Sequence, residues 1–284
     1  MAAYLRPETV DQALAVLAQH PATIAAGCTD LFPATEAQVL PGPVLDLTAI
    51  PGLRGIEQGP DSWRIGATTT WTDLCRADLP PAFDMLKQAA REVGSIQIQN
   101  AGTVAGNLCN ASPAADGVPP LLALDASVEV QSAGAMRQVP LAQFLTGVRQ
   151  TDLSQGEMVT AIHIPASGTS GISRFVKLGA RKYLVISAAM VAVRLVLSEG
   201  RITQAACAVG ACSAVATRLP KLEQALIGRA GADAAATITS DIVAPALSPI
   251  SDIRGDAAYR IDVACELLRR AVGDLAGDRA EASA

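Results

Sequence analysis

SIQIQNAGTVAGNLCNASPAADGVPPLLALD, residues 95–125, is the segment of the 284-residue chain from which its architecture is best read. Residues 95–110 are polar, contain glycine and follow neither helical nor strand periodicity, so we predict a long irregular stretch there. Long irregular stretches inside compact domains are commonly functional. Residues 118–124 have the composition of a helix. We therefore expect a functional loop that runs into a helix.

Helical and strand patterns alternate on both sides of this segment. Helices are predicted over residues 10–18, capped by Thr9, and over residues 81–93, and the polar cluster Cys28-Thr29-Asp30 has the composition of a helix start. Short strands are predicted over residues 24–26, 44–47, 63–67, 127–131 and 158–164. The first domain therefore mixes α and β structure.

The small residues ASGTSG at positions 166–171 have linker composition, and we place the domain boundary there. The predicted domains are residues 1–168 and 172–275. In the second, strands are predicted over residues 175–178, 185–197 and 202–209, followed by helices over residues 219–226, capped by Thr217, and over residues 258–272. The fold class is α+β, with a small antiparallel sheet and helices in the second domain.

Composition excludes several classes of protein. A net charge of −5 argues against a nucleic-acid partner, since such proteins carry excess Lys and Arg. The start of the chain lacks the pattern of a signal peptide, and the longest apolar run, residues 183–193, is too short to span a bilayer. We expect a soluble, cytoplasmic protein.

The six cysteines form no C-x-x-C pair and there are only two histidines, so we predict reduced, mostly buried thiols and no metal site.

Two glycine-containing turns, AGCTD at residues 26–30 and GTVAGN at residues 102–107, are the candidate ligand-binding segments. Successive backbone N–H groups without bulky side chains can surround an anion such as a pyrophosphate. Neither turn has the dinucleotide or P-loop fingerprint, and the chain has no G-x-S-x-G motif. A nicotinamide-binding Rossmann domain, an NTPase and a hydrolase are therefore disfavoured, but such turns alone do not identify a cofactor.

Residues 95–125 resemble the signature of the FAD subunits of molybdenum hydroxylases, the carbon monoxide dehydrogenase and xanthine dehydrogenase group. That signature has a run like Q-I-R-N-x-G-T-I-G-G-N, then A-S-P-A-A-D and a Pro-Leu-Leu-rich helix. AGCTDLFP at residues 26–33 is similar to the family's second flavin loop, and FVKLGAR at residues 175–181 to its K-L-G-x-R strand. DIRGDAAYR at residues 252–260 resembles an element of its C-terminal domain. The resemblance covers nearly the whole chain.

The resemblance implies a vanillyl-alcohol-oxidase-type (PCMH-type) FAD-binding domain of two α/β subdomains, followed by the α+β domain characteristic of these flavoproteins. It implies FAD as the cofactor, and no catalytic residue or metal ligand on this chain. The partners implied are a large subunit with the molybdenum cofactor, a small subunit with two [2Fe–2S] clusters, and an external electron acceptor. The residues implied to contact FAD are Ala26, Gly27, Cys28, Thr29, Asp30, Leu31, Gly102, Thr103, Val104, Ala105, Gly106, Asn107, Asp116 and Lys177.

The chain departs from the family pattern where Cys28 and Ala105 replace glycines, at a cost of about 1–2 kcal/mol for any such residue that needs a positive φ. Two residues have alternative interpretations. Asp116 either approaches FAD, caps the helix near Val118, or does both. Lys177 is either an exposed strand lysine or a cation beside the flavin.

The function implied is electron transfer, from partner iron–sulfur clusters through FAD to an acceptor. One alternative is a stand-alone FAD-dependent reductase or oxidase, which would need its own substrate site and proton donor. Another is a flavin-free scaffold protein.

Overall fold

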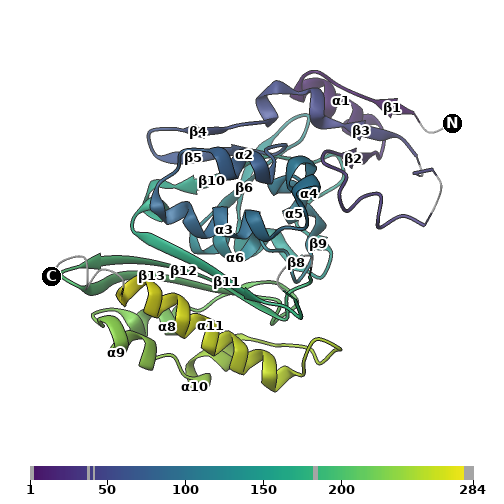
Figure 1. Ribbon diagram of the computed structural model, residues 1–284. Coiled ribbons are helices and arrows are strands. Elements are labelled where there is room, and N and C mark those ends of the chain that lie inside the picture. Colours follow the sequence, from purple (N-terminus) through teal and green to yellow (C-terminus); the bar gives the residue numbers. More distant parts are fainter. Residues whose placement is uncertain (1–2, 37–38, 41, 182–184, 278–284) are drawn as a thin grey trace.

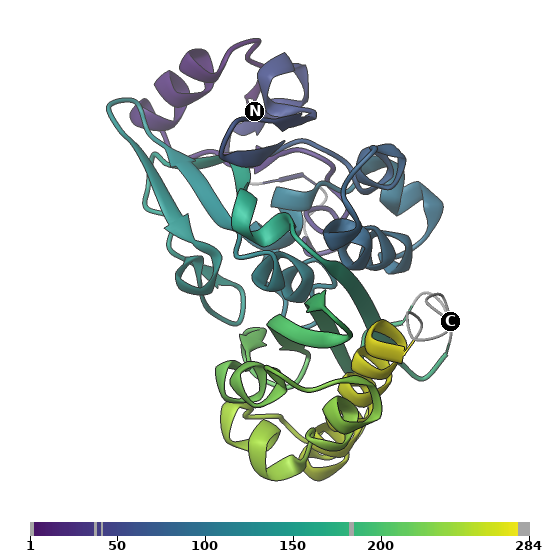
Figure 2. The same ribbon diagram turned by 90° about the vertical axis from the view of Figure 1, so that its left-hand side faces the viewer.

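The computed structural model describes residues 3–36, 39–40, 42–181 and 185–277 of the chain. Three units follow one another along the molecule (Figure 1). Seen from the side, the purple and blue N-terminal elements occupy one end and the yellow and green C-terminal helices the other (Figure 2).

The first unit is a three-stranded parallel sheet in the order β1-β3-β2. Its elements are β1 (Tyr4–Leu5), α1 (Val10–Gln19), β2 (Thr23–Ala25) and β3 (Val44–Asp46). Thr9 caps α1 by accepting a hydrogen bond from Gln12 N, as the sequence predicts. Leu14 and Leu17 of the helix pack on Leu45 of the central strand, because parallel strands need a crossover that covers the sheet.

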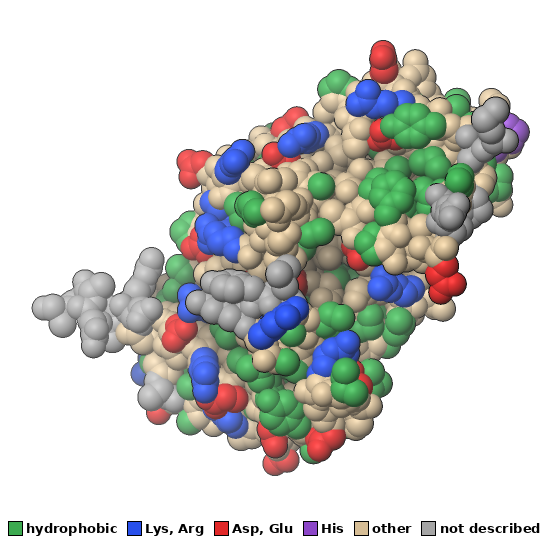
Figure 3. Space-filling view, turned by 45° about the vertical axis from the view of Figure 1, so that its right-hand side comes forward, with side chains coloured by type: hydrophobic (Ala, Val, Ile, Leu, Met, Phe, Trp, Pro, Cys, Tyr) green, Lys and Arg blue, Asp and Glu red, His purple; other side chains and the backbone are tan. Residues whose placement is uncertain are grey.

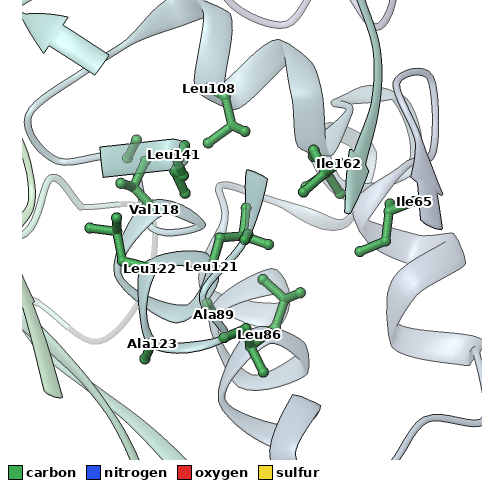
Figure 4. Packing of buried hydrophobic residues seen from close by; sticks show 14 of the residues in the cluster. Ile65, Leu86, Ala89, Leu108, Val118, Leu121, Leu122, Ala123, Leu141 and Ile162 are labelled. Carbon is green, nitrogen blue, oxygen red and sulfur yellow. The ribbon is translucent and has the colours of Figure 1, made fainter. Parts of the chain in front are cut away.

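The second unit is a five-stranded antiparallel sheet in the order β4-β5-β10-β6-β7 with helices on one face. The strands are β4 (Ile56–Gln58), β5 (Ser62–Gly66), β6 (Ser127–Gln131), β7 (Met136–Pro140) and β10 (Met158–Pro165). The helices are α2 (Trp71–Arg76), α3 (Asp84–Glu92), α4 (Ile96–Ala101), α5 (Val104–Asn110), α6 (Val118–Ala123) and α7 (Leu141–Phe144), and β8 (Leu145–Gly147) and β9 (Gln150–Thr151) form a separate hairpin. Figure 4 shows their buried core, in which Leu86, Leu108 and Leu121 from three helices lie near Ile65 and Ile162 of the sheet.

The prediction of an irregular stretch over residues 95–110 is wrong, because the stretch forms α4 and α5. Each helix has only six or seven residues, too few to present a periodic apolar stripe. Their starts are fixed by caps: Ser95 accepts from Ile98 N, and Thr103 accepts from Gly106 N. Conversely, Cys28-Thr29-Asp30 opens no helix, and Thr29 and Asp30 begin a turn that continues through residue 34.

The third unit is a four-stranded antiparallel sheet, β11 (Ile172–Leu178), β12 (Ala189–Ser198), β13 (Arg201–Gly210) and β14 (Thr217–Arg218). One face carries α8 (Pro220–Leu226), α9 (Gly231–Ala236), α10 (Ser240–Val243) and α11 (Ala257–Gly277). The opposite face packs on α3 and α6 of the second unit. The α+β fold class is confirmed.

Three details of the third unit differ from the sequence predictions. The strand expected from Val185 begins at Ala189, and residues 183–184 of the apolar run lie outside the described part. Thr217 lies in β14 and does not cap α8, whose N-cap position is Leu219 with no side-chain cap. The expected flexible linker is a 3-10 helix, Ala166–Thr169, packed so closely that a methyl group on Gly168 would lie 2.2 Å from Leu124 O.

Candidate cofactor site

The two glycine turns lie against each other. A methyl group added at Gly27 would lie 1.9 Å from the carbonyl oxygen of Ala101, and one added at Gly102 would lie 3.1 Å from Thr29 Oγ1. No side chain other than hydrogen fits at Gly27 unless the backbone moves. Two segments far apart in the sequence therefore lie with their backbones in direct contact.

The second turn is held from behind by the start of α2. Val104 N donates to Thr69 O at 3.0 Å, and Trp71 N donates to Gly102 O at 3.2 Å. Thr70 and Asp73 form a capping box at the start of α2, which fixes the backbone of residues 69–71 to which the second turn is hydrogen-bonded. The position of the turn is therefore fixed by hydrogen bonds within the protein itself.

Several backbone N–H groups of the two turns have no acceptor in the part of the chain that the structure describes. They belong to Gly27, Cys28 and Thr29 in the first turn and to Thr103 and Ala105 in the second. Converging backbone N–H groups form an anion-binding concavity without any cation. The side chains of Val104 and Ala105 are buried in the core, so only their backbone can serve a ligand.

Asn107 supplies the clearest sign of a missing partner. Its Oδ1 is buried without a hydrogen bond among the described residues, and it would lie 3.0 Å from a methyl group on Gly117. An unmet buried acceptor costs about 1–3 kcal/mol, so a bound group with a hydroxyl or N–H donor would relieve it. The N–H groups of the two turns and this acceptor together fit a ligand with a diphosphate and hydroxyl groups, as FAD has.

Asp116 and Lys177 form a buried ion pair between the second and third units. Lys177 Nζ donates to Asp116 Oδ2 at 3.2 Å and to Glu92 O at 3.2 Å, and Ser187 Oγ donates to Asp116 Oδ1 at 3.3 Å. The two side chains are 7% and 13% exposed, so Lys177 is not an exposed strand lysine. Asp116 does not cap α6, because the N-cap position is Gly117 and receives no side-chain bond.

The environment of Asp116 makes its ionisation unusual. Burial raises the pKa of Asp116 to about 6, against the opposing effects of Lys177 and Ser187. The carboxylate is therefore charged at neutral pH but gains a proton under mildly acidic conditions. This would free Lys177 of its counter-ion.

We predict a pH-dependent contribution of Asp116 to stability. Between its unfolded value of 3.8 and its folded value of about 6, the native state holds a proton that the unfolded chain has released. The contribution therefore falls as pH rises through this window, by about 3 kcal/mol at 1.36 kcal/mol per pKa unit. Urea denaturation of wild type and Asp116→Asn at pH 4 and 7 checks this. A difference between the two proteins that stays constant across the window would contradict it.

Cys28 and Ala105, which replace glycines of the family pattern, differ in backbone conformation. Cys28 has a φ of 56°, in the left-handed region, whereas Ala105 lies inside α5 and is not among the described residues with positive φ. Only Cys28 therefore carries the cost of a side chain in that conformation.

We predict that Cys28→Gly stabilises the chain by about 1 kcal/mol, since glycine adopts this φ freely. Ala105→Gly is the matched control and should destabilise it by roughly 0.5–1 kcal/mol, because it places glycine within a helix. Thermal and urea unfolding of both variants decide the point. Equal effects of the two substitutions would show that the backbone at Cys28 is not strained.

Two cavities adjoin the first glycine turn and the Asp116–Lys177 pair. The space-filling view shows one face of the molecule, hollowed between its upper and lower parts (Figure 3). One cavity, of about 400 Å³, follows the first turn, and its lining includes Tyr4, Phe32, Val44 and Asp46. The other, of about 600 Å³, lies between α3 and β11, and its lining includes Arg91, Glu92, Arg174 and Lys177. The sequence analysis named Ala26 and Cys28 of the first cavity's lining but missed Tyr4, Phe32, Val44 and Asp46, because these residues come from separate segments of the chain.

No group of three or more His, Cys, Asp or Glu side chains placed to hold a metal ion occurs in the described ranges. Within the same ranges, no helix is long and apolar enough to cross a membrane. Three cysteines, Cys207, Cys212 and Cys265, are buried, whereas Cys28 and Cys75 are half-buried and Cys109 is exposed.

Comparison with known proteins gives two family matches. The family described as the FAD binding domain in molybdopterin dehydrogenase matches residues 1–167. The family described as the CO dehydrogenase flavoprotein C-terminal domain matches residues 174–275.

Individual proteins are similar over nearly the whole chain. The nicotine 6-hydroxylase medium subunit of Paenarthrobacter nicotinovorans is 31% identical, with 95% of each chain covered. The carbon monoxide dehydrogenase medium chain of Hydrogenophaga pseudoflava is 28% identical, again with 95% of each covered. Among solved structures, reconstituted CO dehydrogenase from Oligotropha carboxidovorans superimposes with a TM-score of 0.89 at 29% identity, covering 97% of this chain and 98% of that one.

Proposed function

The chain belongs to the FAD-binding subunits of the molybdenum hydroxylases, and from this membership we propose that it transfers electrons from a partner's iron–sulfur clusters to an external acceptor. It is a flavoprotein subunit of an oxidoreductase, and its cofactor is FAD. The medium-chain relatives belong to multi-subunit enzymes. We propose that this chain likewise joins a molybdenum-cofactor large subunit and a small subunit with two [2Fe–2S] clusters.

The contact between the two glycine turns is the observation that carries the proposed binding mode. Residues 26–31 and 102–107 would hold the diphosphate through backbone N–H groups, and Asn107 Oδ1 would accept a hydrogen bond from the bound cofactor. The cofactor-binding domain would comprise residues 1–168 and the C-terminal domain residues 172–275.

Bound FAD supplies the ability to accept electrons singly and release them in pairs. The chain's own residues provide position and charge. Lys177 would place a cation beside the flavin, and Asp116 would hold that cation in place while balancing its charge at neutral pH. Since both are buried, their field acts in a medium less screened than water.

We predict non-covalent FAD at about one per chain, and loss of that FAD in Gly106→Val. A methyl group at Gly106 would already lie 2.6 Å from Thr103 Oγ1, the cap of α5, and valine adds two more carbons at this crowded position. Affinity should fall on the order of 100-fold, because displacing the turn by about 1 Å misplaces its donors. Flavin fluorescence titration measures the change.

Two results would contradict these assignments. A folded wild-type chain that takes up no FAD would overturn the binding mode. Unchanged FAD affinity in a folded Gly106→Val variant would remove Gly106 from the site.

A further inference from the structure

Arg260 is a buried cation in the C-terminal unit that the cofactor site does not use directly. It lies in the first turn of α11 and is 2% exposed. Its NH1 donates to Ala188 O at 2.6 Å and to Ala211 O at 2.9 Å, and its NH2 donates to Asp252 Oδ1 at 2.6 Å. One guanidinium thus joins the start of β12, the end of β13 and the turn at Asp252.

The segment held by Arg260 leads directly to the buried ion pair. Ala188 N donates to Leu178 O at 2.8 Å, and Leu178 follows Lys177 in β11. Ser187, which precedes Ala188, is 2% exposed and donates to Asp116 at 3.3 Å. Arg260 therefore donates to the carbonyl of Ala188, the residue next to Ser187, whose hydroxyl is hydrogen-bonded to Asp116.

The Arg260 side chain does not use all of its hydrogen-bond donors. Its Nε is buried without an acceptor among the described residues, although a buried donor left unpaired costs free energy. Its single carboxylate partner, Asp252, is shared with Arg254. The two backbone carbonyls and the Asp252 carboxylate therefore together determine where the guanidinium lies.

We propose that Arg260 is a positioning residue for the flavin site, which fixes Ser187 through Ala188 and thereby sets the Asp116–Lys177 pair. The consequence for flavin rests on the proposed function, whereas the effect on Asp116 does not. Partners one step removed from ligand-binding groups commonly change affinity when they are lost.

Arg194 offers a matched control. It is 5% exposed, and it also donates to two backbone carbonyls, those of Ala123 and Ser170, and to one carboxylate, Asp125. Arg194 lies in β12, the strand that begins directly after Ala188. Among the described residues, its side chain makes no hydrogen bond to Ser187, Asp116 or Lys177. Arg194→Lys therefore reproduces the loss of a buried guanidinium without touching the proposed chain of contacts.

The experiment compares Arg260→Lys with Arg194→Lys in the full-length chain. The first measurement needs no flavin: carbon-13 NMR follows the Asp116 carboxyl during a pH titration, with Asp116→Asn for assignment. Because Lys177, Glu92 and Ser187 surround this carboxyl, loosening Ser187 should move its titration midpoint upward by about one pH unit in Arg260→Lys only. The second measurement is FAD affinity, which should fall about tenfold in Arg260→Lys and less than about twofold in Arg194→Lys.

A midpoint that stays at the wild-type value in folded Arg260→Lys, or that moves equally in Arg194→Lys, would overturn the proposal. If Arg260→Lys does not fold, Asp252→Asn loosens the same guanidinium and should move the midpoint in the same direction. Failure of that shift would also overturn it. A wild-type chain without FAD affinity would count against the proposed function alone, since the titration is measured on the flavin-free chain.

Discussion

Gly27→Ala is expected to weaken FAD binding strongly, although it adds a single carbon. That carbon would lie 1.9 Å from Ala101 O and 2.6 Å from Ala101 C, both backbone atoms that no rotamer change can move aside. The first turn must therefore withdraw from the second, and the N–H groups of the two turns no longer converge on one ligand. We expect affinity to fall on the order of 100-fold and stability by about 1–3 kcal/mol.

Gly134→Ala is the control for this substitution. Nothing lies within 4 Å of a methyl group at Gly134, and its φ is not positive. Its stability should stay within about 0.5 kcal/mol of wild type and its FAD affinity should not change. Circular dichroism and flavin titration on both variants test the prediction. A folded Gly27→Ala chain with wild-type affinity would mean that the contact between the turns does not shape the site.

Apolar periodicity or a continuous apolar run predicted those elements that are strongly buried along the chain. The helix at residues 10–18 corresponds to α1, which buries one face, and the strands predicted within residues 185–209 correspond to β12 and β13, which contain continuous buried apolar runs. The strand before Ala189 was overextended because composition is apolar from Val185 onward, yet Ile186 is 56% exposed. An exposed apolar residue has the same signature in the sequence as a buried one.

Short helices and long-range polar pairs could not be predicted in this way. α4 and α5 depend on the caps Ser95 and Thr103 and on the backbone of α2, contacts that no local pattern reports. The partner of Lys177 is Asp116, which the resemblance to the family named without linking the two. Their pairing depends on how β11 packs on α3 and how α6 packs on β12 and β13, so it follows from tertiary structure alone.

The isolated chain, fully loaded with FAD, is expected not to oxidise the organic substrate of the assembled complex. On the proposed function, the molybdenum centre that oxidises the substrate lies on the large partner subunit, and this chain contributes the flavin. Flavin bleaching after substrate addition should be at least about 100-fold slower for the lone subunit than for the complex, because a donor bound next to the flavin acts at a high effective concentration. Anaerobic stopped-flow absorbance on both preparations measures the two rates, with dithionite as the control that each flavin can be reduced. Rapid substrate-dependent bleaching in the lone subunit would contradict the electron-transfer function and indicate a stand-alone flavoenzyme that binds its own substrate.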